Sequence, residues 1–313
     1  MTTDQNILIG FGLIVAAVTI ATFVIPKRVG TEITPESLKI GMGLPVIWIY
    51  YNDSDVNSRQ WYDFGARSSR VINIPILNLF YQTIVNANKE KYRVQVITGL
   101  TGVKELLGEN VPVPLLYNKR TINVPEEDWI RSAVLAKYGG LWLSSSTICL
   151  KGFGDLPKDK IVAFGQDTDP MYGSAIPGFR ALWSPRANDP FFVEWEARCR
   201  ERLNYQLGGR QFRGDAKSDW LDLCQKYGSC EVRVKEELGR DPKTNKKIEL
   251  EDLLAAGTEG KIPFTIPEQA VYLVVPYQDL LDRRHFGWIL RSSEEQIKSS
   301  DLVLSHILAK KNQ

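Results

Sequence analysis

The stretch EDWIRSAVLAKYGGLWL, residues 127–143, decides the fold. An acidic first turn opens a helix, because carboxylates stabilise the positive end of the helix dipole. Gly139 and Gly140 close it, since glycine adopts the positive φ angles common at helix ends. Apolar residues follow at once. The stretch therefore predicts a helix over 126–138 that runs directly into a buried strand over 141–143.

The same alternation of strand and helix continues on both sides of this stretch. The run PVIWIYY, residues 45–51, is apolar throughout, which is typical of a central strand covered on both faces. A helix over 76–88 and a strand over 92–97 complete one β-α-β unit. Further elements are predicted as a strand at 161–164 and helices at 190–203 and 299–310. The pattern indicates a doubly wound, mostly parallel α/β sheet with helices on both faces, whose ligands bind at the carboxyl ends of the strands.

The composition argues against nucleic-acid binding and against a structural zinc site. The 313 residues include 39 basic and 37 acidic side chains spread along the chain, for a net charge of +2. No field of one sign is available to hold a polyanion, so no nucleic-acid partner is expected. The four cysteines have no C-x-x-C spacing, which argues against structural zinc. We expect all of them to be free thiols in a reducing compartment, namely Cys149, Cys199, Cys224 and Cys230.

The N-terminal region predicts a membrane anchor. Residues 1–6 form a tail, and residues 7–26 include an uncharged apolar run long enough to cross a bilayer as a helix. A cleaved signal peptide is the alternative, but no positive segment precedes the run. Residues 27–43 then read as a tether, and 44–313 as the folded domain. Lys27 and Arg28 directly follow the span, so the positive-inside rule puts the body in the cytoplasm.

The helix and strand of the opening stretch resemble the capsular polysaccharide synthesis proteins, relatives of the glycosyltransferases that carry a DXD sugar-binding region. That family has an Asp, two residues and an Arg on a helix ending in Tyr-Gly-Gly, as Asp128, Arg131 and residues 138–140 do here. A hydrophobic strand containing Trp follows, matched by Trp142. The resemblance extends over about residues 44–304. It implies a GT-A-like fold and a nucleotide-sugar donor.

The chain departs from the family directly after that strand. The resemblance implies an acidic residue there, holding a divalent cation that bridges the donor's two phosphates. Ser144 stands at that position, followed by Ser145 and Ser146. A hydroxyl is a neutral and weak ligand for a hard cation, so the sequence argues against Mn²⁺ or Mg²⁺ bound here.

Two acidic pairs elsewhere follow predicted strands. Asp167 and Asp169 come after the strand at 161–164 and are our candidates for catalysis and for any metal. Asp53 and Asp55 come after the first strand and could reach the same edge. Aspartate is also a favoured turn residue after strands, which explains both pairs without a ligand.

The remaining candidates have two interpretations each. Asp128 and Arg131 lie on one helix face, where they can support a ribose or only stabilise the helix. The glycine pair allows a close approach of the backbone to a nucleotide, or only caps the helix. His285 follows two arginines and either contacts the donor diphosphate or belongs to a solvated turn. The predicted donor-binding residues are thus Asp128, Arg131, Gly139, Gly140, Ser144, Ser146 and His285.

Two functions remain open at this point. The chain is either a membrane-anchored glycosyltransferase that moves a sugar from a nucleotide-sugar donor to a glycan or glycoprotein acceptor, or an inactive protein of the same fold. In the second case it serves as a membrane-tethered scaffold with protein assembly partners, since a fold alone does not grant a function. The polar stretch 240–247 is expected to be an exposed excursion, and Trp48 and Trp142 to be core residues.

Overall fold

The computed structural model describes residues 43–56, 74–108, 111–112, 115, 122–166, 176–207, 214–257 and 261–309. The chain divides into two compact units, Met1–Glu32 and Ile33–Gln313, and every described residue belongs to the second. The predicted tail and membrane helix lie outside the described residues. No helix within the described ranges is long and apolar enough to cross a membrane.

A six-stranded sheet forms the centre of the described part, in the order β2-β1-β3-β6-β5-β7. Strand β6 is antiparallel to its neighbours β3 and β5, and the other pairings are parallel. The strands are β1 (Val46–Tyr51), β2 (Arg93–Thr98), β3 (Gly140–Leu143), β5 (Ile161–Phe164), β6 (Ala181–Ser184) and β7 (Cys230–Arg233). The predicted mostly parallel α/β sheet is confirmed.

Side chains of β1 alternate between two hydrophobic cores, as the twofold repeat of a strand requires. Ile47, Ile49 and Tyr51 pack into one core. Trp48 and Tyr50 pack into the other. Both faces are therefore buried, which explains why the strand reads as a continuous apolar run. Trp48 and Trp142 are each 1% exposed, so their prediction as core residues is confirmed.

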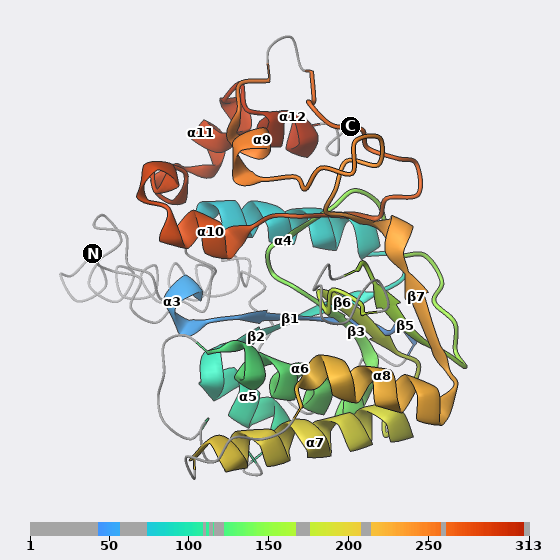
Figure 1. Cartoon of the computed structure of the whole chain (residues 1–313). Helices are drawn as coiled ribbons and strands as arrows, with labels where there is room; N and C mark the ends of the chain where they lie inside the picture. Colours follow the sequence, from blue (N-terminus) through green and yellow to red (C-terminus); the bar gives the residue numbers. More distant parts are fainter. Residues whose placement is uncertain are drawn as a thin grey trace, which may run out of the picture. The chain divides into compact units, whose positions relative to one another are not determined.

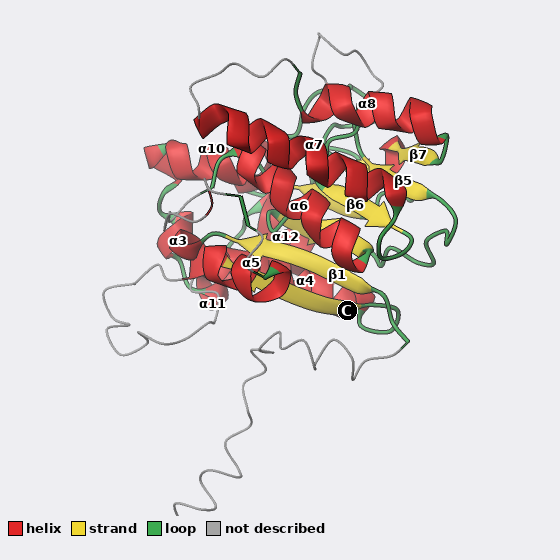
Figure 2. Cartoon of the chain, turned by 90° about the horizontal axis from the view of Figure 1, so that it is seen from below, coloured by secondary structure: helices red, strands yellow, loops and turns green. Residues whose placement is uncertain are grey.

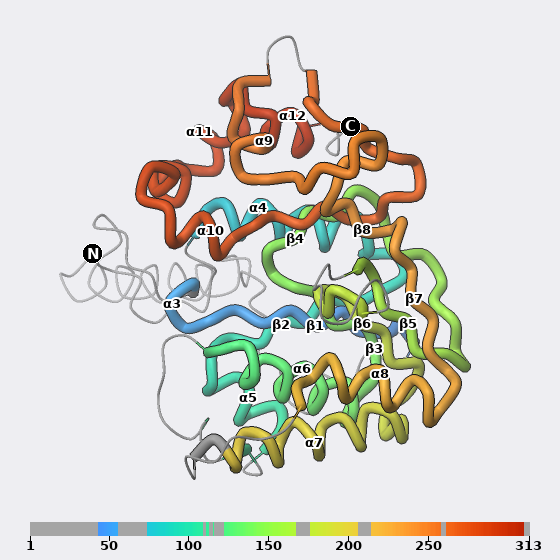
Figure 3. Tube along the Cα trace, in the orientation of Figure 1, coloured from blue at the N-terminus to red at the C-terminus, as the bar shows by residue number. Residues whose placement is uncertain are grey.

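Helices cover both faces of the sheet, as Figures 1 and 2 show. One face carries α5 (Gly99–Leu107), α6 (Val124–Tyr138), α7 (Pro190–Leu207) and α8 (Ala216–Tyr227). The other carries α4 (Pro75–Asn88) and a three-stranded sheet of β4 (Thr147–Cys149), β9 (Tyr272–Val274) and β8 (Glu237–Leu238). The short helices α9 (Leu250–Leu254), α10 (Tyr277–Asp282), α11 (Glu294–Ser299) and α12 (Val303–Ala309) complete that side (Figure 3).

Two helices begin at other residues than predicted, because capping interactions set where a helix starts and ends. Helix α6 begins at Val124 because the Asn123 side chain accepts a hydrogen bond from the Glu126 N–H, and the Glu126 carboxylate accepts one from the Asn123 N–H. The C-terminal helix predicted over 299–310 is present as α12 but begins only at Val303, because α11 ends at Ser299 and Ser300 adopts an extended conformation.

The cysteine prediction is also wrong for one pair. Cys224, in the last turn of α8, and Cys230, the first residue of β7, form a disulfide with a Cα–Cα distance of 5.5 Å. The turn between the two elements folds back and brings the residues together, and spacing alone did not reveal it. Cys149 and Cys199 are buried thiols, as expected.

Candidate functional site

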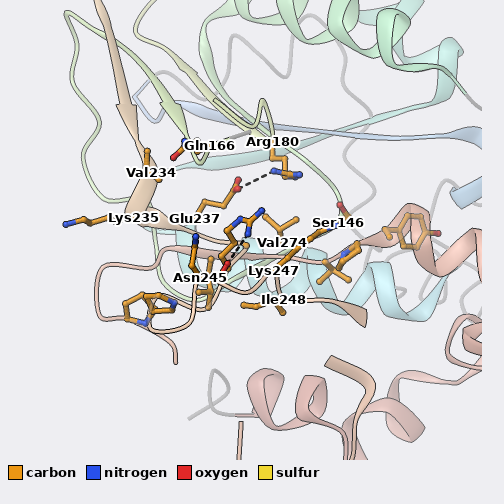
Figure 4. Close-up of a pocket in the computed structure, with 18 of the residues that line it drawn as sticks. Ser146, Gln166, Arg180, Val234, Lys235, Glu237, Asn245, Lys247, Ile248 and Val274 are labelled. Carbon is orange, nitrogen blue, oxygen red and sulfur yellow. Dashed lines mark hydrogen bonds and ion pairs between the residues drawn. The ribbon is translucent and has the colours of Figure 1, made fainter. Parts of the chain in front are cut away.

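A cavity of about 840 Å³ opens at the carboxyl edge of the six-stranded sheet. Ser146 follows β3, Gln166 follows β5, and Val234 follows β7, so three parallel strands end at this cavity (Figure 4). Arg180 directly precedes β6. Because β6 runs antiparallel, its first residue lies at the same edge. The cavity is where ligands of α/β sheets are expected to bind.

The facing wall comes from the C-terminal part of the chain. Val274 of β9 and Tyr277 of α10 line it, together with residues of the 240–247 stretch such as Asn245 and Lys247. Arg240 and Lys247 form an antiparallel bridge that closes this stretch into a tight loop. The loop is largely exposed, as predicted, but it also contributes to the cavity, which the sequence did not indicate.

Positive charge predominates among the described residues that line the cavity. The basic side chains are Arg180, Lys235, Arg240 and Lys247, and the acidic ones are Glu237 and Asp279. The Glu237 side chain is only 6% exposed and pairs with Arg180 at 3.2 Å. The cavity therefore suits an anionic ligand.

Ser144 and Ser146 converge at the end of β3. Their hydroxyl oxygens lie 3.1 Å apart, and the Ser144 N–H donates to the Arg180 carbonyl at 2.7 Å. Ser146 lines the cavity. Two neutral hydroxyls do not fit a hard divalent cation. Within the described residues, no group of three or more His, Cys, Asp or Glu side chains could hold a metal ion.

The structure describes only one of the two acidic pairs, Asp53 and Asp55. Asp167 and Asp169 lie outside the described residues. Asp53 accepts a backbone hydrogen bond from Leu100 in the first turn of α5. Asp55 is 5% exposed and accepts from the Tyr277 hydroxyl at 3.2 Å, and burial raises the pKa of its carboxyl group. Asp53 and Asp55 are therefore both hydrogen-bonded within the fold, and the partner of Asp55, Tyr277, lines the cavity.

Asp128 and Arg131 form a buried ion pair of 3.0 Å on α6. Burial raises the pKa of Asp128 to about 6, and the nearby Arg131 opposes that rise. Arg131 also donates to the Phe179 carbonyl at 2.5 Å. Neither residue lines the cavity, but Phe179 immediately precedes Arg180. The pair holds the backbone that presents Arg180.

The glycine pair and His285 are placed away from the cavity lining. Gly139 and Gly140 lie at the amino end of β3, opposite the end that carries Ser144. A Cβ on Gly140 would lie 2.5 Å from the Val46 carbonyl oxygen, so close strand packing requires glycine there. His285 lies in a 3-10 turn after α10 and stacks on Phe286. It is not among the residues that line the cavity.

Sequence reasoning missed the residues that do line it. Arg180 and Glu237 belong to no recognisable motif, and Lys235 lies in a 3-10 turn, Val234–Glu236, that no local pattern predicted. For Arg180 and Lys235 the available signal was position, because Arg180 precedes β6 and Lys235 follows β7 at the same edge of the sheet, whereas Glu237 belongs to β8 of the second sheet. Ser146 was the one predicted donor-binding residue that the structure places in the lining.

Comparisons with known proteins add little beyond the fold class. No protein-family model matches the chain, and no curated protein matches its sequence. Among solved structures, the PaToxG glycosyltransferase is similar with a TM-score of 0.36 and 15% identity, covering 59% of this chain and 70% of that protein. The glycosyltransferase GlyE of Streptococcus pneumoniae TIGR4 has a TM-score of 0.37 and 9% identity, covering 86% of this chain. Its apo form gives the same TM-score and identity.

These neighbours are glycosyltransferases, but TM-scores this low carry no argument about the activity of this chain. The chain spans 60% of the GlyE structure and 63% of its apo form, less than two thirds of either. Any activity, substrate or partner of this chain must therefore be argued from its own residues.

Proposed function

We propose that this protein is a glycosyltransferase that binds a nucleotide-sugar donor at the carboxyl edge of its sheet and transfers the sugar to a glycan or glycoconjugate acceptor. One observation carries the proposal: the cavity at that edge is lined by Arg180, Lys235, Arg240 and Lys247. A nucleoside diphosphate group is the anionic part of such a donor. Guanidinium and ammonium groups bind phosphate oxygens through charge-assisted hydrogen bonds.

In the proposed transfer, the bond between the anomeric carbon and the diphosphate oxygen breaks, and the diphosphate leaves with the electron pair. The acceptor hydroxyl oxygen bonds to the anomeric carbon and gives its proton to a carboxylate base, for which Asp167 and Asp169 are our candidates. Negative charge grows on the leaving diphosphate, so fixed cations stabilise the transition state more than the ground state. Arg180 directly precedes β6 and Lys235 follows β7, so both cations lie at the strand edge, and Lys247 adds charge from the facing wall.

No step of this proposal needs a divalent cation. The hydroxyls of Ser144 and Ser146 do not fit one, and the cationic side chains supply the charge that a metal would otherwise provide. Asp167 and Asp169 remain our proposed catalytic residues, and they are also the candidates for any metal that is bound. Asp128, Arg131, Gly139, Gly140 and His285 remain predicted donor-site residues whose contact with a ligand is untested.

Thermal unfolding of the purified full chain tests donor binding. A ligand that binds only the folded state at 100 times its dissociation constant adds about 2.7 kcal/mol to the free energy of unfolding. We expect the midpoint to rise with the concentration of a UDP- or GDP-sugar, without Mn²⁺, and to stop rising in Arg180→Ala. Lys158→Ala, on an exposed loop outside the cavity, is the matched control. A flat midpoint with millimolar donor, with and without Mn²⁺, contradicts the proposal.

A gain-of-function variant tests the metal reasoning separately. Because the Ser144 and Ser146 hydroxyls are 3.1 Å apart, aspartates at both positions would direct two carboxylates to one point. We expect Ser144→Asp with Ser146→Asp to acquire Mn²⁺ binding, measured by calorimetry, that the unchanged chain lacks. Equal Mn²⁺ affinity in both proteins would contradict this geometry.

A catalytically inactive scaffold is the second candidate, and the serines in place of the family's acid favour it. In that case the cavity is a remnant, and protein partners replace donor and acceptor. Donor-dependent stabilisation without any sugar transfer or donor hydrolysis would support this candidate over the first.

We also propose that residues 7–26 anchor the protein in a membrane, with Lys27 and Arg28 favouring a cytoplasmic body. The full chain is expected to resist alkaline extraction from membranes. A variant with Val15→Lys and Val18→Lys should be released, because charge at the centre of a spanning helix is costly. Release of the unchanged chain would remove the anchor from the proposal.

A further inference from the structure

We infer that Glu237, fixed by the Tyr272 hydroxyl, positions Arg180 as the residue that recognises the anionic group of the ligand. This deepens the proposed function, on which it rests, by naming the recognition residue and the group that holds it. None of these three residues was predicted from the sequence.

The Glu237 carboxylate is held at both of its oxygens. The Tyr272 hydroxyl donates to Oε2 at 2.7 Å, and Arg180 Nη1 donates to Oε1 at 3.2 Å. Tyr272 is fully buried, and burial raises the pKa of its hydroxyl well above the ordinary value. The hydroxyl therefore stays protonated and keeps donating at any physiological pH. A buried neutral donor thus fixes a buried carboxylate, and the carboxylate fixes one arm of the guanidinium.

Arg180 keeps its other donors for a ligand. Its side chain is 41% exposed and reaches the cavity, whereas that of Glu237 is 6% exposed (Figure 4). Within the described residues, Glu237 is the only hydrogen-bond partner of the guanidinium, so Nε and Nη2 remain available. A guanidinium held by one arm presents the rest of its fork to an oxyanion in a defined direction.

The backbone before Arg180 is held as firmly as its side chain. Phe179 has a φ of 55°, an uncommon angle for a residue with a side chain. Its carbonyl accepts from Arg131, and its ring packs against Trp195 and Trp220. These contacts hold the backbone at the start of β6, so the direction of the Arg180 side chain depends on its contact with Glu237.

Glycines make room for this pair. A Cβ on Gly165 would lie 2.2 Å from Glu237 Cδ, and one on Gly178 would lie 2.7 Å from Arg180 Nη1. Gly178 does not have a left-handed φ, and the atom it would displace is the end of a flexible side chain. Gly178→Ala should therefore move the guanidinium at little cost to the fold. Gly102 of α5 lies outside the cavity lining, and its added Cβ would make only ordinary contacts, the nearest at 3.5 Å from Ile97.

The test is binding of inorganic pyrophosphate to the full chain by calorimetry at low salt. Glu237→Gln removes a negative charge, so simple electrostatics predicts tighter binding of the anion. Positioning predicts the opposite sign, and we expect affinity to fall by about tenfold. Tyr272→Phe changes no charge and should weaken binding by about threefold to tenfold. Gly178→Ala should weaken it similarly, and Gly102→Ala should leave it unchanged.

Tighter binding in Glu237→Gln, or equal affinities in Gly178→Ala and Gly102→Ala, would overturn the inference. So would an unchanged chain that does not bind pyrophosphate. Thermal midpoints without ligand separate an unfolded variant from a mispositioned one, and Gly178→Ala covers the case in which Glu237→Gln does not fold. If pyrophosphate binding depends on Glu237 but no sugar nucleotide binds, the proposed function fails and the inference stands. If sugar nucleotides bind equally well to the unchanged chain and to Glu237→Gln, the inference fails and the proposed function stands.

Discussion

The α6–β3 region and the cavity wall from Val234 to Lys247 differ in burial and in whether their residues belong to a recognisable motif. Most of α6 is buried, including the charged residues Asp128 and Arg131. The wall is mostly exposed and is built from a 3-10 turn, a two-residue strand and a loop. The first region carries the recognisable motif, and the second supplies side chains that line the cavity. The motif residues of the α6–β3 region, here called the frame, support the fold, and residues without a motif line the cavity.

The link between the two regions is the carbonyl of Phe179. Arg131 donates to it from the frame, and the next residue, Arg180, meets Glu237 of the wall. A variant of the frame should therefore reduce stability, whereas a variant of the wall should reduce binding and leave stability unchanged. This contrast can be tested at single residues.

Arg131→Met should have the largest effect on stability. It leaves the Asp128 carboxylate 6% exposed without its closest cation and removes a hydrogen bond to Phe179. Breaking a buried ion pair by removing one partner costs about 3–5 kcal/mol. The free energy of unfolding, measured with urea, should fall by that amount. Arg186→Met is the control, because Arg186 pairs with Asp189 but its side chain is 68% exposed. It should cost less than about 1 kcal/mol, and equal losses would contradict the frame interpretation.

A second prediction concerns the pH dependence that Asp128 imposes. Burial raises the pKa of its carboxyl group from 3.8 to about 6 in the folded state. The folded protein therefore binds this proton more tightly than the unfolded chain, so its contribution to stability falls as pH rises from about 4 to about 6. The fall is on the order of 3 kcal/mol. Asp128→Asn should lack it, so the stability difference between the two proteins should change with pH in this window. A constant difference would mean that burial does not raise this pKa.

The elements of the frame could be predicted because their signals are local. Apolar runs gave the strands at 45–51 and 161–164, and the acidic turn and glycine pair bounded α6. The cavity could not be predicted in the same way. Arg180 precedes β6 of the six-stranded sheet, and Glu237, 57 residues away, lies in β8 of the other sheet, so only the tertiary fold brings them together. Nothing in the sequence next to either residue indicates the other.

The disulfide between Cys224 and Cys230 is also not indicated by the neighbouring sequence, although the two residues are close along the chain. It gives a third prediction. Closing a loop between residues separated by 6 positions stabilises a protein by about 2 kcal/mol through chain entropy. Cys224→Ser should lose about that amount under non-reducing conditions, and Cys149→Ser, which leaves the disulfide intact, is the control for loss of a thiol. Alkylation of the denatured, unreduced chain should label two thiols, and labelling of four would contradict the disulfide.

That experiment also bears on the orientation of the proposed anchor. Disulfides persist in oxidising compartments, whereas the charges of Lys27 and Arg28 favour a cytoplasmic body. The two arguments point in opposite directions. Counting thiols in protein taken directly from its membrane, with alkylation before lysis, decides between them.

Substitutions of exposed lysines in the cavity wall should have the smallest effect on stability. Lys247 is exposed and lines the cavity, whereas its neighbour Lys246 pairs with Asp252 at 3.7 Å and lies outside the lining. Both substitutions to Met should change the free energy of unfolding by less than about 0.5 kcal/mol. Lys247→Met should weaken pyrophosphate binding about threefold at low salt, and the difference should shrink at high salt because the charge is screened. Equal binding by the two variants would show that this loop does not face the ligand, and the distinction between frame and wall would then hold only at Arg180 and Glu237.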